Sequence, residues 1–166
     1  QGYSDESYWA RGQAWGIAGM AISYRYERLP AYRDTFERLL AFYLKRLPDD
    51  LIPFWDLIFA DGDGEPRDSS AAAIVACGLL EMAELETPEK AAEYRDLAKR
   101  MVKSLAHVYS VRDPAISNGQ LLHGTYSKKT PHNTCRGEGV DECVSWGDYY
   151  YLEALIRLSR NWSSYW

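Results

Sequence analysis

The sequence predicts an all-α fold in which helical hairpins form an arc of two layers. Apolar residues recur at helical spacing in five segments of the 166-residue chain. Segments that begin near residues 7, 69 and 147 are rich in small residues and follow long loops, whereas those near 31 and 89 are more charged and follow short links. Small residues permit close packing on both sides of a helix, whereas a helix rich in charged residues needs one face exposed to solvent. The first set should therefore form an inner layer and the second an outer layer.

The first two helices are expected over residues 9–26 and 31–47. The first carries the apolar stripe Trp15, Ala18, Ile22 and Tyr26. The second carries the stripe Phe36, Leu39, Leu40, Tyr43 and Leu47. Pro30 separates the two helices, and Pro48 and Pro53 end the second, because proline cannot continue a helix.

The remaining three helices follow a long polar loop. The third begins in DSSAAAIVACGLLEMAEL, where Asp68 or Ser69 is expected to cap it. The fourth runs from Pro88 to about Val111, on the stripe Tyr94, Leu97, Met101 and Leu105. A second long loop, residues 112–147, leads to the last helix, DYYYLEALIRLSRNW. Five helices are fewer than a closed double ring needs, so we expect an arc of a toroid with its long loops at one end.

Composition restricts the class of protein. The net charge of −5 argues against a nucleic-acid partner. No apolar run reaches the roughly 18 residues of a membrane span. The odd number of cysteines indicates a reducing compartment, so we expect a cytoplasmic protein. The 13 Tyr and 6 Trp residues suit either carbohydrate stacking or bulky helix packing. The chain starts at Gln1, within a polar turn, and we expect it to be a piece of a longer protein.

Local motifs for metals or acid–base chemistry are weak. In DGDGEPRDSSAA, Pro66 and Ala72 occupy positions where a calcium loop needs Gly and Glu. The spacing of the possible zinc ligands matches no known pattern: His123, His132, Cys135 and Cys143. The loop carboxylates are better explained as turn formers and helix caps than as a general acid: Asp56, Asp61, Asp63, Asp68, Asp141, Glu142 and Asp148.

Blocks at the start, middle and end of the chain resemble a known family. QGYSDESYWARGQAWG, EPRDSSAAAI and GVDECVSWGDYYYLEALIR are similar to sequences of the unsaturated glucuronyl hydrolases. These bacterial enzymes act after polysaccharide lyases on glycosaminoglycan fragments. The resemblance implies an (α/α)6 barrel, which agrees with the arc inferred above. It assigns residues 1–166 to the C-terminal portion of a single barrel domain whose N-terminal portion is absent from this chain.

The resemblance also implies a glycoside hydrolase reaction. Its substrates are lyase-generated disaccharides with a C4–C5 double bond in the uronic acid, and hydration of this vinyl ether releases the unsaturated sugar without a metal or organic cofactor. The family's catalytic aspartates lie in the first half of the protein, so no catalytic residue is assigned here. This chain alone is expected to be inactive. Its open barrel edge should be covered by the missing N-terminal portion or by another chain.

The first block supplies most of the substrate-binding residues that the resemblance implies: Gln1, Trp9, Arg11 and Trp15. The apolar face of a sugar stacks on indole, and its carboxylate or sulfate suits a guanidinium fork. A buried structural cluster is the alternative for Trp9 and Arg11, and core packing is the alternative for Trp15.

The loop HGTYSKKTPHNTCRGEG supplies the remaining candidates, Tyr126 and Ser127. The resemblance implies that Tyr126 contributes an aromatic to the cleft. In some family members a serine and a lysine of this loop accept a sulfate, and Ser127 matches that serine. Glu138 stands near where the lysine would be expected, so a sulfate preference does not follow.

Two other classes of protein remain alternatives on the residues alone. One is a non-catalytic carbohydrate-binding module of helices, and the other is a helical-repeat scaffold in which the aromatics only pack. A repeat scaffold predicts loops of uniform period, whereas this chain has loops of very unequal length.

Overall fold

The computed structural model describes residues 2–163 of the chain. Within this range the secondary structure is helical, with isolated β-bridges between loops. The α-helices are α1 (Ala10–Glu27), α2 (Pro30–Leu44), α3 (Ser69–Ala83), α4 (Pro88–Ser104) and α5 (Ser145–Ser159). A π-helical segment, η1 (Leu105–Tyr109), continues directly from α4. The predicted all-α fold is confirmed.

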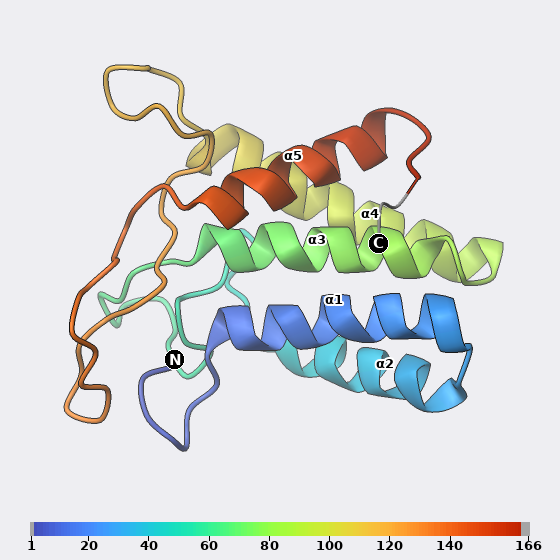
Figure 1. Ribbon diagram of the computed structural model, residues 1–166, viewed down its shortest axis with the longest axis horizontal. Helices are drawn as coiled ribbons and strands as arrows, with labels where there is room; N and C mark the ends of the chain where they lie inside the picture. The colour runs from blue at the N-terminus through green and yellow to red at the C-terminus, as the bar shows by residue number, and fades with distance from the viewer. Residues whose placement is uncertain (1, 164–166) are drawn as a thin grey trace.

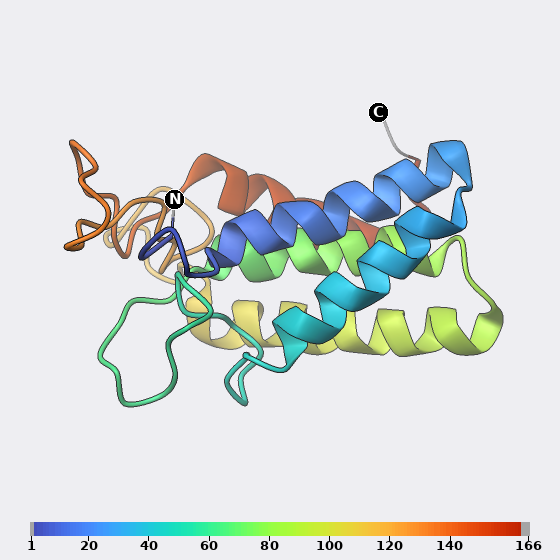
Figure 2. The ribbon, with the colours of Figure 1, turned by 90° about the horizontal axis from the view of Figure 1, so that it is seen from below.

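The helices form two layers. Helices α1, α3 and α5 lie side by side, and α2 and α4 cover one side of that layer (Figures 1 and 2). Every residue of α3 is buried, because α1, α5 and α4 all pack against it. The small-residue helices therefore form the inner layer and the charged ones the outer layer, as the composition predicts. None of the described helices is both long and apolar enough to cross a membrane.

Glycine permits the close approach of α1 to α3. A Cβ atom added to Gly78 would lie 3.0 Å from the Cα atom of Ala18. The two backbones can thus touch only because neither position carries a large side chain. Proline begins both outer helices, with Pro30 in α2 and Pro88 in α4, where its fixed φ suits the first helical turn.

Several local predictions need correction. The fourth helix does not continue as an α-helix to Val111, because the π-helical segment η1 follows Ser104 and ends at Tyr109. Tyr26 was expected on the apolar stripe of the first helix, yet it is 60% exposed. Asp68 does precede α3, but within the described residues its side chain makes no capping hydrogen bond. Its carboxylate is engaged elsewhere, as described below.

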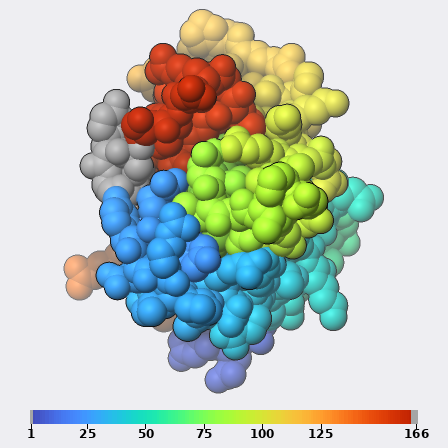
Figure 3. Space-filling view, turned by 90° about the vertical axis from the view of Figure 1, so that its right-hand side faces the viewer, coloured from blue at the N-terminus to red at the C-terminus, as the bar shows by residue number. Residues whose placement is uncertain are grey.

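The long loops gather at the N-terminal ends of α1, α3 and α5, as predicted (Figure 1). The short links between α1 and α2 and between α3 and α4 lie at the opposite end, which faces the viewer in Figure 3. Hydrogen bonds tie the loops together. The hydroxyl of Thr130 donates to the carbonyl of Tyr3 over 2.7 Å, and the ammonium of Lys128 lies 2.5 Å from a carboxylate oxygen of Glu65.

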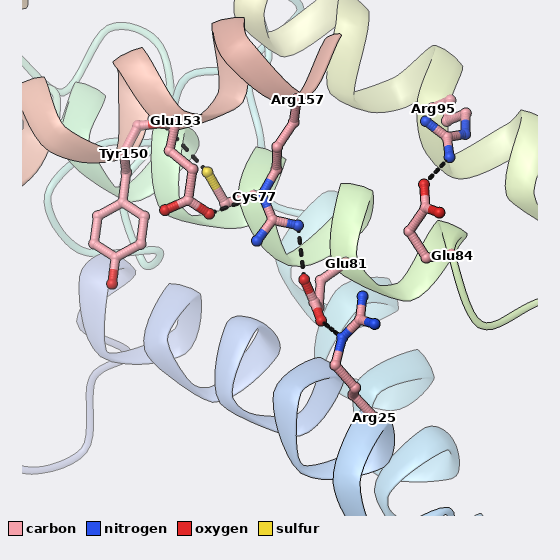
Figure 4. Close-up of polar contacts among 8 residues, drawn as sticks. All are labelled: Arg25, Cys77, Glu81, Glu84, Arg95, Tyr150, Glu153 and Arg157. Carbon is pink, nitrogen blue, oxygen red and sulfur yellow. Dashed lines mark hydrogen bonds and ion pairs between the residues drawn. The ribbon is translucent and has the colours of Figure 1, made fainter. Parts of the chain in front are cut away.

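A chain of buried charges joins the inner helices near their C-terminal ends (Figure 4). Glu81 of α3 forms ion pairs with Arg25 of α1 and with Arg157 of α5, the latter at 2.7 Å. Arg157 also lies 2.8 Å from Glu153, one turn earlier in α5. Glu81, Glu153 and Arg157 are each at most 6% exposed. This network fixes the register of the inner helices at the end away from the loops.

Candidate functional site

Residues from the three inner helices and a loop meet at the loop end of the bundle. The guanidinium of Arg11, in the first turn of α1, lies within cation–π distance of two indole rings. Its central carbon is 4.9 Å from the ring centroid of Trp9, which precedes α1, and 5.1 Å from that of Trp146, in the first turn of α5. Asp68, which precedes α3, lies 3.0 Å from the same guanidinium. We call Trp9, Arg11, Asp68, Tyr126 and Trp146 the aromatic–arginine cluster.

Hydrogen bonds hold Arg11 from one side. Its Nη1 donates to Asp68 at 3.0 Å, to the hydroxyl of Ser70 at 3.2 Å and to the carbonyl of Thr125 at 3.3 Å. Within the described residues, Nε and Nη2 have no such partner. Arg11 is 4% exposed and Asp68 is fully buried. The guanidinium fork predicted for a substrate anion is therefore partly occupied by a protein carboxylate.

Aromatic side chains supply the rest of the cluster. The indole N–H groups of Trp9 and Trp146 are both buried, and neither has an acceptor among the described residues. Buried donors without an acceptor are rare in native proteins, and each one calls for a specific explanation, such as a bound water or ligand. The ring of Tyr126 meets that of Trp146 edge-on, with centroids 5.9 Å apart, and Tyr126 is 39% exposed. Tyr126 thus presents an aromatic surface to solvent beside a buried arginine.

A loop hairpin holds Tyr126 and Ser127 in place. The backbone N–H of Tyr126 donates to the carbonyl of Gly139 at 2.8 Å, and the N–H of Gly139 donates to the carbonyl of Ser127 at 2.8 Å. The Ser127 hydroxyl donates to the carbonyl of Gly137 at 3.2 Å. This hydroxyl is thus used within the hairpin, and its role toward a sulfate stays a prediction.

Trp15 and Gln1 are the remaining predicted site residues. Trp15 is 39% exposed, one turn after Arg11, and meets Tyr150 of α5 edge-on with centroids 5.2 Å apart. It lines a pocket of about 120 Å³ between α1, α3 and α5. Trp15 is therefore only partly buried, and its ring packs against α5 beside this pocket. Gln1 lies outside the described residues.

Sequence reasoning missed Trp146 and the role of Asp68. Trp146 lies within a block that resembles the family, but a tryptophan in the first turn of a helix is usually explained by packing. Asp68 stands where a helix cap is expected, and this local signal concealed its pairing with Arg11. The partners of Asp68 come from positions 57 residues earlier in the chain and two residues later, at Arg11 and Ser70.

The other loop carboxylates have structural roles. Asp56 is fully buried and accepts hydrogen bonds from the backbone N–H groups of Tyr3 and Tyr8, which anchors the N-terminal loop. Asp148 accepts from the backbone of the second long loop, and Asp141 pairs with the ring of His123. Among the described residues, no group of three or more His, Cys, Asp or Glu side chains is arranged to hold a metal ion.

Comparisons with known proteins identify relatives of the whole chain. It is 46% identical to an unsaturated chondroitin disaccharide hydrolase of Streptococcus agalactiae, an alignment that covers 100% of this chain and 41% of the relative. It is 40% identical to an unsaturated glucuronyl hydrolase of a Bacillus species, with 100% of the chain and 43% of the relative covered. No protein-family model matches the sequence.

Solved structures agree with the sequence matches. The unsaturated glucuronyl hydrolase of Streptococcus agalactiae superposes with a TM-score of 0.90 at 46% identity, covering 100% of this chain and 43% of that one. A mutant of that protein has been solved in complex with dGlcA-GalNAc6S. These hydrolases have an α/α-barrel fold, so the predicted arc of such a barrel is confirmed. By sequence and by fold, the chain is similar along its whole length to the unsaturated glucuronyl hydrolases, and it spans about two-fifths of the length of these relatives.

Proposed function

We propose that this chain is the C-terminal portion of an (α/α)6-barrel glycoside hydrolase that removes unsaturated uronic acid from glycosaminoglycan disaccharides. In this reaction an acid protonates C4 of the C4–C5 double bond and water adds at C5. The resulting hemiketal collapses and releases the sugar linked at C1. The relatives that carry these activities in their names are more than twice as long as this chain.

The aromatic–arginine cluster is the observation that carries the proposal. It lies where the long loops meet the N-terminal ends of α1, α3 and α5, and aromatic rings with a few fixed polar groups are typical of sugar sites. Trp9, Arg11 and Tyr126 are residues that the family resemblance already nominates. Trp146 extends the same surface, because its ring contacts both Arg11 and Tyr126.

The burial of two loop aspartates supports placing the catalytic acid in the N-terminal portion. A general acid must reach the atom that it protonates. Asp56 and Asp68 are fully buried, and the oxygens of Asp68 are engaged by Arg11 and Ser70. We therefore assign binding to this chain and proton transfer to the part of the barrel that precedes it.

The edges of the arc fit the same proposal. A groove of about 300 Å³ runs between α1 and α2, and apolar or aromatic side chains form much of its lining, among them Tyr8, Leu39 and Phe42. On α5, Leu152 is 45% exposed. The N-terminal portion of the barrel would cover these surfaces. All three cysteines are free thiols, in keeping with a cytoplasmic location.

The ultraviolet absorbance of the substrate double bond tests the proposal. Unsaturated chondroitin and hyaluronan disaccharides would be given separately to the full-length protein and to the 166-residue chain. We expect only the full-length protein to remove the absorbance. Removal by the chain alone would place the acid among its own loop aspartates. Removal by neither, with sugar binding retained, would favour a non-catalytic carbohydrate-binding module.

Replacing Gly139 with alanine tests the role of Tyr126. A Cβ atom at this position would overlap the Tyr126 ring, so the ring must leave its contact with Trp146. We expect KM in the full-length protein to rise about threefold to tenfold, the equivalent of one aromatic contact, with little change in melting temperature. Gly137→Ala is the matched control, because its Cβ would meet no atom within 4 Å. Equal KM values for the two variants would remove Tyr126 from the site.

A further inference from the structure

The ion pair between Arg11 and Asp68 is unusual in its burial and in its surroundings. Asp68 is fully buried and Arg11 is 4% exposed. The hydroxyl of Ser70 lies between them, donating to Asp68 Oδ1 at 2.5 Å and accepting from Arg11 Nη1 at 3.2 Å. The carboxylate therefore fixes the guanidinium through a direct contact and through a bridging hydroxyl.

Burial opposes the charged form of both partners. Burial raises the pKa of Asp68 more than the nearby Arg11 and the hydrogen bonds lower it. Burial also lowers the pKa of Arg11 more than Asp68 raises it. In both groups the loss of hydration outweighs the attraction between the charges. Exchanging a buried ion pair for apolar residues is often neutral for stability, so a role in positioning is compatible with this pair.

The buried network at the other end of the helices shows the opposite balance. Burial raises the pKa of Glu81, but the contacts with Arg25 and Arg157 outweigh it and leave that pKa below its ordinary value. Burial lowers the pKa of Arg157, yet its carboxylate partners raise it above its ordinary value. The attraction between the charges therefore outweighs the effect of burial on the pKa of Glu81, whereas it does not do so for Asp68.

The position of Asp68 explains what its ion pair can do. The guanidinium that it holds contacts Trp9 at the start of α1 and Trp146 at the start of α5. Asp68 lies between these helices, at the start of α3. Because the hydrogen bond to Asp68 fixes Nη1 from the α3 side, the guanidinium plane cannot turn freely. Each indole ring therefore packs against a guanidinium whose position is fixed.

We propose that Asp68 is a positioning residue for substrate binding. It holds the Arg11 guanidinium at a fixed place, and the guanidinium in turn sets the Trp9 and Trp146 rings that receive the sugar. The proposal rests on the function proposed above, because its readout is binding of the disaccharide. Asp68 itself does not touch the substrate.

The test compares Asp68→Ala, Asp68→Asn and Glu81→Gln in the full-length protein, with KM and kcat measured on an unsaturated chondroitin disaccharide. Asp68→Ala removes the acceptor for Nη1, and we expect KM to rise about tenfold while kcat changes far less. Asp68→Asn keeps an amide oxygen but loses the charge, so its KM should lie between those of the wild type and Asp68→Ala. Glu81→Gln is the matched control. It weakens an equally buried ion pair about 20 Å away along α3, and its KM should equal that of the wild type.

The outcomes separate the two proposals. An inactive wild-type protein would overturn the proposed function. An active wild type with unchanged KM in Asp68→Asn and in any Asp68→Ala that folds would overturn the positioning role of Asp68 alone. A KM for Glu81→Gln raised as much as that of the Asp68 variants would also overturn it, because general loosening would then explain both.

Discussion

Replacing Arg11 with alanine is expected to destabilise the protein by about 3–5 kcal/mol and to raise KM. The substitution removes the counter-charge of Asp68 and leaves a fully buried carboxylate without its cation. It also empties the space between the rings of Trp9 and Trp146. Denaturant unfolding of the full-length protein measures the first effect, and disaccharide kinetics measure the second.

The destabilisation should depend on pH with a definite sign. Without Arg11, burial raises the pKa of Asp68 still further above its ordinary value. The native state then binds a proton more tightly than the unfolded state, so the stability of Arg11→Ala rises as pH falls through the folded-state pKa of Asp68. The deficit relative to the wild type should therefore shrink toward acid pH.

A double variant provides the control for this pH dependence. Arg11→Ala combined with Asp68→Asn removes the buried charge, so it should recover much of the lost stability at neutral pH. Its remaining deficit should change little with pH. A deficit of Arg11→Ala that stays constant from neutral to acid pH would contradict the assignment of the effect to Asp68.

Replacing Glu81 with alanine is expected to lower the free energy of unfolding by about 3–5 kcal/mol. Glu81 is 3% exposed and pairs with Arg25 and with Arg157, which is itself 6% exposed (Figure 4). Its removal leaves the buried guanidinium of Arg157 with Glu153 as its one carboxylate partner among the described residues, and it removes the ionic bridge between α1 and α5. Thermal and denaturant unfolding of the full-length protein would measure the loss.

The nearby pair between Glu84 and Arg95 offers the matched comparison. Glu84 is 52% exposed and Arg95 is 39% exposed, and both are drawn in Figure 4. Water screens such a pair, so Glu84→Ala should change stability by no more than about 1 kcal/mol. Equal losses in Glu81→Ala and Glu84→Ala would show that burial of the network does not matter. Neither substitution should alter KM, because both lie at the end away from the loops.

The fold follows from the sequence to a large extent because its signals are periodic and local. Helical spacing of apolar residues located all five helices, and the contrast between small and charged compositions separated the inner from the outer layer. Helix ends were less certain. The change from α4 to the π-helical segment η1 depends on packing at the end of the helix, and no residue near Ser104 signals it.

The sequence predicted only part of the candidate site. Trp9 and Arg11 stand two positions apart, and the family resemblance nominated them together with Tyr126. The resemblance also named Trp15, whose ring packs against Tyr150 of α5 and lines a pocket between the inner helices. Whether the proposed sugar contacts each of these residues remains a prediction.

The sequence by itself determined the five helices, their two layers and the resemblance to the unsaturated glucuronyl hydrolases. Only the tertiary structure decided that Asp68 pairs with Arg11 and that Trp146 closes over the guanidinium. The reason is physical. Helical periodicity is a property of neighbouring residues, whereas a buried charge finds its partner through folding. The partners here come from the starts of three helices that are far apart along the chain.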